Sequence, residues 1–225
     1  MSKKNPQGSD AAPRFMVVEG PIGVGKTSLA QRLAQSFGGE VVLEHSEQNP
    51  FLERFYRSKR DAALPAQLFF LFQRARQLEE LRQSDMFSPV RVADYHFAKD
   101  RLFAEINLDR EEMVLYDQIS ARLHVEAPVP DLMIYLQASV DSLLQRISRR
   151  GIPWERSIDR RYLERLTDAY ARYFHQYDDG PLLIVNASSI DPLHNETDYE
   201  QLYRQIRRTS GGRHFFNPAA AAALA

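Results

Sequence analysis

The stretch FMVVEGPIGVGKTSLA occupies residues 15–30 and decides the fold. It begins with four apolar residues, 15–18, which are typical of a buried strand. Residues 20–27 then match the pattern G-x-x-x-x-G-K-[ST] without a mismatch, and Leu29, Leu33 and Phe37 follow at helical spacing. A strand, a glycine-rich loop and a helix in this order predict a phosphate-binding loop, or P-loop, at a helix N-terminus.

The residues of this loop suit a nucleoside triphosphate and its metal ion. Glycines let backbone N–H groups approach phosphate oxygens closely. We expect Lys26 to reach the β- and γ-phosphates of ATP and the Thr27 hydroxyl to bind Mg²⁺. The predicted nucleotide-binding residues are Gly20, Gly23, Gly25, Lys26, Thr27 and Ser28.

Composition narrows the class of protein. The chain has 225 residues, of which 44% are hydrophobic and 26% charged, as in an ordinary globular protein. A net charge of −1 argues against a protein that coats nucleic acid, and the lack of cysteine excludes disulfides and thiolate zinc sites. No apolar run approaches the roughly 18 residues of a membrane span, and the N-terminus lacks the apolar core of a signal peptide. We expect a cytoplasmic protein.

Further apolar runs predict the rest of the fold. Runs at residues 40–45, 90–94, 131–136 and 182–185 read as four more strands, with helical patterns between them that include a long helix beginning at Pro65. Unalternating strands separated by helices predict an α/β fold with a five-stranded parallel sheet and helices on both faces. We expect one domain over residues 14–209 with a lid at about 146–158, a disordered tail over 1–13 and a flexible tail over 210–225.

Charged residues follow the predicted strands. Glu44 comes at the end of the second strand and Asp94 at the end of the third. Ligands of parallel sheets gather at the carboxyl ends of strands, so one acid suits a general base and the other a Mg²⁺ ligand. Either acid alone could instead be a helix cap or a surface residue. Arg146, Arg149 and Arg150 end a predicted helix, where they could stabilise a transferring phosphoryl group or simply be solvated.

Together these motifs resemble the deoxynucleoside kinases, particularly their bacterial purine-preferring members, from residue 15 to about residue 206. The resemblance implies a P-loop kinase that moves the γ-phosphoryl group of ATP to the 5′-hydroxyl of a deoxynucleoside. It implies that Glu44 accepts the hydroxyl proton and that Arg146 and Arg150 close over the transferring group. It further implies that Lys26 contacts the triphosphate, together with a Mg²⁺ ion bound by Thr27 and Asp94. Tyr56 and Glu155 would bind the sugar 3′-hydroxyl. Gln67 and Arg74 would contact the base, with Asp100 as the acidic partner of Arg74.

The chain departs from the family pattern in two places. The family commonly has an arginine directly after the acid of the third strand, whereas here the sequence is Asp94-Tyr95-His96. Lys99 or Arg101 could supply the missing charge. Ile152 also stands where the family has a lid arginine, and Arg149 could compensate for it.

Two other functions stay open at this point. One is a nucleoside monophosphate kinase of the thymidylate kinase kind, which would need extra arginines where Tyr56 and Glu155 stand. The other is a nucleotide switch or scaffold that transfers nothing. With any of these functions, the helices predicted over residues 50–86 carry more apolar surface than one face of a sheet can bury. This surplus predicts a homodimer in which helices of the two copies pack together.

Overall fold

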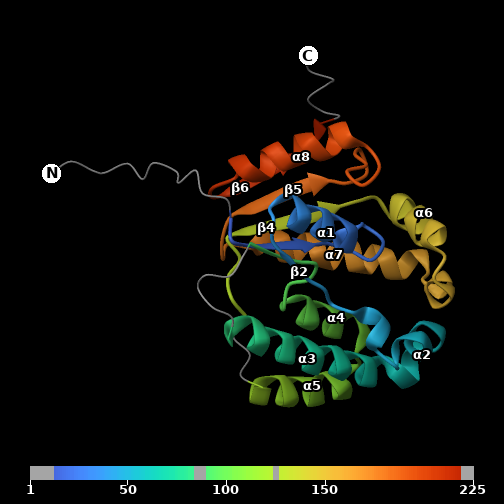
Figure 1. Cartoon of the computed structure of the whole chain (residues 1–225). Coiled ribbons are helices and arrows are strands. Elements are labelled where there is room, and N and C mark those ends of the chain that lie inside the picture. The colour runs from blue at the N-terminus through green and yellow to red at the C-terminus, as the bar shows by residue number, and fades with distance from the viewer. Residues whose placement is uncertain (1–12, 84–89, 124–126, 219–225) are drawn as a thin grey trace.

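The computed structural model describes residues 13–83, 90–123 and 127–218. These residues form a parallel sheet with helices on both faces and a separate helical layer beside it (Figure 1). The expected disorder of residues 1–13 falls, except for Pro13, outside the described residues. Among the described helices, none is both long and apolar enough to cross a membrane.

The sheet has six strands in the order β2-β3-β1-β4-β5-β6, and every pairing is parallel. Its centre is apolar on both faces, as the sequence runs predict: strand β4 is buried at five of its six positions. The strands are β1 (Phe15–Glu19), β2 (Glu40–Val42), β3 (Arg91–Ala93), β4 (Leu132–Gln137), β5 (Leu182–Asn186) and β6 (Arg213–Phe216).

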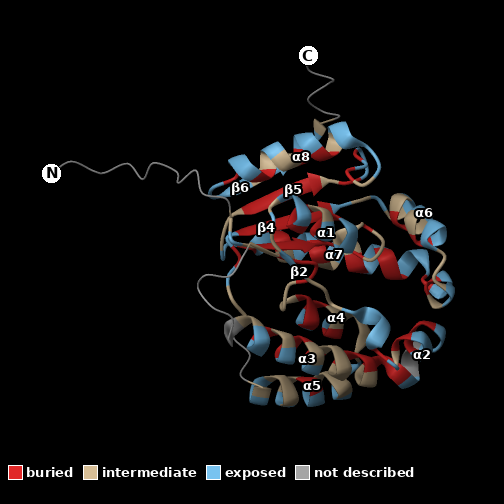
Figure 2. Ribbon diagram, in the orientation of Figure 1, coloured by how far each residue is buried: buried red, intermediate tan, exposed pale blue. Residues whose placement is uncertain are grey.

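Helices cover both faces of this sheet, with buried residues toward it and exposed residues on their outer sides (Figure 2). Helices α1 and α8 lie together, because Ser36 and Tyr199 share a hydrogen bond of 2.5 Å between their hydroxyls. The helices are α1 (Lys26–Ser36), α2 (Leu52–Arg57), α3 (Lys59–Gln83), α4 (Lys99–Asn107), α5 (Arg110–Leu123), α6 (Val140–Arg150), α7 (Arg160–Gln176) and α8 (Glu196–Arg208), with 3₁₀ turns η1 (Ser46–Gln48) and η2 (Pro153–Ser157).

The sequence placed the start of the long helix α3 too late. The helix begins at Lys59, so Pro65 lies inside it rather than at its first position. Proline has no N–H, so the carbonyl of Asp61, four residues earlier, receives no helix hydrogen bond from it. The guanidinium of Arg54 donates to that carbonyl at 3.4 Å. A partner from α2 therefore helps this helix to tolerate its proline.

The sheet also has one strand more than the five that were predicted. Residues 213–216, which the sequence assigned to a flexible tail, form β6 and pair with β5 from Leu182↔Arg213 to Val185↔Phe216. The prediction of a flexible tail over residues 210–225 is therefore wrong for residues 213–216. This edge strand is short and alternates exposed with half-buried positions, so it lacks the continuous apolar run of the inner strands.

Candidate active site

The phosphate loop lies between β1 and α1 at the carboxyl end of the sheet. Its glycines stand where a side chain has no room: a Cβ on Gly20 would lie 2.5 Å from the carbonyl oxygen of Leu136, and one on Gly23 would lie 2.7 Å from Cγ1 of Ile147. Both glycines have positive φ, 149° and 84°. At these two positions the loop backbone packs directly against β4 and α6, which a residue with a Cβ would prevent.

The ammonium of Lys26 is held inside this loop. It donates to the carbonyl oxygen of Gly20 at 2.7 Å and to that of Pro21 at 3.2 Å. Burial lowers the pKa of Lys26 to about 8, Lys99 adds to that effect, and Glu19 opposes it. A phosphate group bound in the loop would add a negative charge next to this ammonium and favour its protonated form.

Asp94 and Thr27 meet beside the loop. The Thr27 hydroxyl donates to Oδ2 of Asp94 at 2.5 Å, and the backbone N–H of Glu44 donates to Oδ1 at 2.8 Å. Burial raises the pKa of Asp94, and the hydrogen bond from Thr27 works against that shift. A hydroxyl oxygen and a carboxylate oxygen from different elements thus lie close together. Mg²⁺ prefers oxygen ligands and is usually bound by only one or two protein side chains, so this pair suits it.

The side chain of Glu44 is bound by two cations. Lys99 donates to Oε2 at 2.7 Å, and Arg74 forms an ion pair with Oε1 in which its Nε lies at 3.0 Å. Burial alone would raise the pKa of Glu44, but Lys99 and Arg74 outweigh it and hold the pKa far below its usual range. Glu44 is therefore ionised at neutral pH.

A buried polar network continues from Arg74 into the helical layer. Arg74 also forms an ion pair with Asp100, which accepts a hydrogen bond of 2.5 Å from the hydroxyl of Tyr116. The amide nitrogen of Gln67 donates to the backbone oxygen of Asp100 at 2.8 Å and to its Oδ1 at 3.2 Å. Because both partners are acceptors, the amide oxygen of Gln67 is the atom left for a ligand.

A cavity of about 180 Å³ brings most of the predicted residues together. Tyr56 of α2 and Glu155 of η2 line this cavity, together with Phe55 and Tyr162. Asp100 does not line the cavity but supports Gln67 and Arg74 from behind. The predicted residues around the cavity are Gly23, Lys26, Thr27, Glu44, Tyr56, Gln67, Arg74, Asp94, Arg150 and Glu155.

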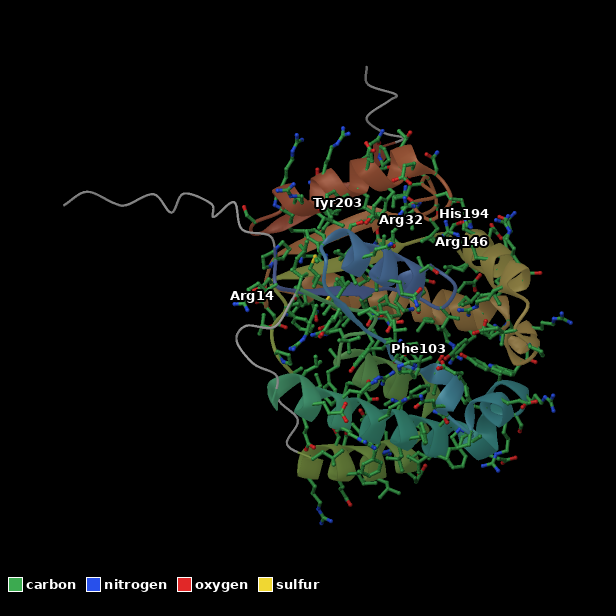
Figure 3. All side chains as sticks on the ribbon, in the orientation of Figure 1. Arg14, Arg32, Phe103, Arg146, His194 and Tyr203 are labelled. Atoms are coloured by element: carbon green, nitrogen blue, oxygen red, sulfur yellow. The ribbon has the colours of Figure 1, made fainter. Side chains whose placement is uncertain are left out.

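A second cavity, of about 300 Å³, lies on the other side of the phosphate loop. It is lined by Gly25, Ser28 and Arg146, and by the segment 191–194 after β5, whose residue His194 lies near Arg146 (Figure 3). Gly23, Lys26, Thr27 and Arg150 line both cavities. The two hollows therefore adjoin at the phosphate loop, the arrangement that transfer between two ligands requires.

The lid arginines have different partners. Arg146 donates to the backbone oxygens of Val24 at 3.1 Å and Ala187 at 2.6 Å. Arg150 forms an ion pair with Glu155, with its Nε at 3.0 Å from Oε2. Glu155, expected at a sugar hydroxyl, is thus bound to the arginine expected at the phosphates.

Lys99, Arg101 and Arg149, the candidates to replace the two missing family arginines, lie in different places. Lys99 points to Glu44 and lines the first cavity, whereas Arg101 lies outside it and pairs with Glu105 and Asp117. Arg149 lines the second cavity. Lys99 is therefore the residue placed to act near Glu44.

Sequence reasoning missed two parts of this region. The segment 191–194 carries no motif, and only its position after a parallel strand could have indicated it. The carboxylate of Glu19 is buried at the end of β1, directly before the phosphate loop. A charged residue that ends an apolar strand was the available signal for it.

Comparison with known proteins gives a consistent result. Residues 16–210 match the family model described as deoxynucleoside kinase. The chain is 37% identical to a deoxyguanosine kinase of Bacillus subtilis (strain 168), covering 86% of this chain and 96% of that one. It is 29% identical to a deoxyadenosine/deoxycytidine kinase of the same organism, covering 85% and 91%.

Solved structures agree on the fold. A deoxyadenosine kinase from M. mycoides, with products dCMP and a flexible dCDP bound, superposes with a TM-score of 0.75. It shares 24% sequence identity, and the match covers 86% of this chain and 98% of that one.

Proposed function

The chain belongs to the deoxynucleoside kinase family. We propose that it transfers the γ-phosphoryl group of ATP to the 5′-hydroxyl of a purine deoxynucleoside, deoxyadenosine, deoxyguanosine or both. One observation carries the proposal: two cavities adjoin at Lys26 and Thr27, and the first of them is lined by the carboxylate of Glu44. The names of the relatives support a deoxynucleoside as acceptor.

The second cavity suits the donor. The glycine-rich phosphate loop and the half-buried ammonium of Lys26 fit the β- and γ-phosphates of ATP. Thr27 and Asp94 would hold Mg²⁺, because their oxygens already converge within 2.5 Å. The ion would neutralise charge on the phosphate oxygens.

The first cavity suits the acceptor. Tyr56 and Glu155 would bind the sugar 3′-hydroxyl, a group that a tyrosine hydroxyl and a carboxylate can share as donor and acceptor. At the other end, the amide oxygen of Gln67 would accept from a base N–H, and Arg74 with Asp100 would fix that amide. This assignment places the 5′-hydroxyl toward Glu44.

In the proposed reaction the 5′-oxygen forms a bond to the γ-phosphorus while the bond from that phosphorus to the β-γ bridging oxygen breaks. ADP leaves with the electrons of the broken bond, and the hydroxyl proton passes to Glu44. A carboxylate whose pKa is far below its usual range is a weak base, but a loose phosphoryl transition state asks little of the base. Glu44 therefore acts mainly by orienting the hydroxyl, and Arg146 and Arg150 stabilise the transferring group.

The test is phosphoryl transfer from Mg·ATP to four deoxynucleosides and their monophosphates. The proposal expects conversion of deoxyadenosine or deoxyguanosine and no reaction of the monophosphates. Transfer to a monophosphate alone would favour a thymidylate-type kinase and displace Tyr56 and Glu155 from the sugar. Binding of ATP without any transfer would favour a non-catalytic protein.

We also propose that the chain works as a homodimer in the cytoplasm, where ATP is supplied. Phe72 on α3 is 52% exposed, and Val114 and Leu115 on α5 are 54% and 44% exposed. These helices form the layer farthest from β6 (Figure 1), and a second copy would cover their apolar side chains. Light scattering should give twice the 26.0 kDa chain mass, and the paired change Val114→Glu with Leu115→Glu should give the monomer. A monomer for the unchanged protein would contradict the dimer.

A further inference from the structure

Glu19 is a buried carboxylate to which the proposed reaction gives no task. It ends β1, pairs in register with Tyr135 of β4, and is 1% exposed. A polar side chain buried at such a position is tolerated only when hydrogen bonds replace its hydration. Its partners therefore indicate what it is there to hold.

The two oxygens of Glu19 accept three hydrogen bonds from three different elements. Oε1 accepts from the backbone N–H of Gly20 at 2.9 Å and from the hydroxyl of Tyr170 on α7 at 2.9 Å. Oε2 accepts from the backbone N–H of His96 at 2.8 Å. One carboxylate thus joins the phosphate loop, the segment after β3 and the helix that follows the lid.

Both backbone partners are next to groups that would face the triphosphate. Gly20 binds the ammonium of Lys26 through its carbonyl oxygen at 2.7 Å. His96 stands two residues after Asp94, which receives the Thr27 hydroxyl. A shift of either backbone segment would move a cation or a metal ligand by a similar amount.

We propose that Glu19 is a positioning residue that holds the phosphate loop and the segment 94–96 in register, so that Lys26 and Asp94 face Mg·ATP together. The proposal rests on the proposed use of Mg·ATP but not on the identity of the acceptor. Glu19 itself touches neither cavity, so it acts through the two backbone N–H groups.

The task requires a carboxylate rather than an amide. Glutamine has the same length but only one acceptor oxygen. Whichever way the amide is turned, its NH₂ group faces either the N–H of Gly20 or that of His96, so one of the two loses its acceptor. The hydroxyl of Tyr170 can turn to accept instead, so the bond to α7 is the least affected.

The test measures binding of Mg·ATP and of deoxynucleoside separately by titration calorimetry, without turnover. Glu19→Gln should weaken Mg·ATP binding by about tenfold or more, while deoxynucleoside binding stays within about twofold. Asp131→Asn is the matched control, because Asp131 accepts the N–H groups of Arg14 and Phe15 at the opposite end of β1, both at 2.9 Å. One oxygen of Asp131 accepts both N–H groups, so asparagine can keep that acceptor, and the change should leave Mg·ATP binding unchanged.

Equal weakening of both ligands by Glu19→Gln, or unchanged Mg·ATP binding, would overturn the proposal. If that variant does not fold, Tyr170→Phe provides the test, because it keeps both hydrogen bonds from the backbone to Glu19. The affinity for Mg·ATP should then stay within about twofold. A tenfold loss would show that Glu19 does not act through those two backbone N–H groups. If the protein binds Mg·ATP but phosphorylates no nucleoside, that result contradicts the proposed function and leaves the role of Glu19 standing. The binding measurements do not depend on phosphoryl transfer.

Discussion

The ammonium of Lys99 donates a hydrogen bond of 2.7 Å to Oε2 of Glu44, and Lys99 is only 7% exposed. The lysine comes from the first turn of α4, five residues after Asp94, rather than from the position directly after that acid. The buried ammonium of Lys99 therefore reaches Glu44 from helix α4, although the position directly after Asp94 holds Tyr95 and not a cation.

Lys99→Met should lower kcat by about tenfold or more, because it removes the cation that orients Glu44 within the cavity. Arg101→Met is the matched control on the same helix, since Arg101 is exposed and pairs with Glu105 and Asp117. Steady-state kinetics with saturating substrates compare the two. Equal effects of both substitutions, or a fully active Lys99→Met, would deny Lys99 this task.

The central fold could be predicted because its information is local. The phosphate loop is a continuous motif, and the inner strands are unbroken apolar runs. Strand β6 could not be recognised in this way, because an exposed edge strand of four residues needs no such run. Pro65 misled the assignment of α3, since a partner for the carbonyl of Asp61 comes from another helix.

The candidate site was predictable where a residue follows a strand or belongs to a family motif. Glu44 and Asp94 are of the first kind, and Gln67 and Arg74 are of the second. The sequence did not indicate that Arg74 joins Glu44 to Asp100, or that Lys99 rather than Arg101 faces the cavity. Those facts depend on the rotation of helices against the sheet, which one sequence does not define.

Glu44→Gln should lower kcat by a factor of about 10² or more while Mg·ATP binding stays within about twofold of its original value. The amide presents a donor group to two cations that are donors themselves, so it loses the orientation that holds the 5′-hydroxyl, and it cannot take up the hydroxyl proton. Glu40→Gln, at the exposed start of β2, the strand that precedes Glu44, should be fully active. Retained activity in Glu44→Gln would remove Glu44 from the proposed role.

Removing divalent metal with EDTA should abolish transfer, and added Mg²⁺ should restore it. Asp94→Asn should raise the Mg²⁺ concentration for half-maximal activity by about tenfold, because one of the converging oxygens loses its charge. The same comparison can be made at Thr27, where Thr27→Val removes the hydroxyl and the conservative control Thr27→Ser keeps it. An unchanged Mg²⁺ titration for Asp94→Asn would place the ion elsewhere.

Arg74→Met should destabilise the fold by about 3–5 kcal/mol, because it leaves the buried carboxylates of Glu44 and Asp100 without their shared cation. Urea denaturation measures the loss, and Arg76→Met provides the control on α3, since the exposed pair of Arg76 with Glu80 contributes less than about 1 kcal/mol. Adding Asp100→Leu to Arg74→Met should cost less than the two single changes together. Strict additivity would show that the two residues are not coupled.

Tyr56→Phe tests the sugar end of the acceptor cavity with a matched pair of substrates. If the tyrosine hydroxyl binds the 3′-hydroxyl, its removal should lower kcat/KM for the deoxynucleoside by about tenfold, the effect of one lost hydrogen bond in a buried site. The same substitution should hardly change kcat/KM for the 2′,3′-dideoxynucleoside, which lacks the 3′-hydroxyl. Steady-state kinetics with all four combinations give the coupling between the two hydroxyls directly. Equal losses with both substrates would mean that Tyr56 shapes the cavity wall through packing with Phe55, at 5.2 Å between ring centroids, rather than by binding the sugar.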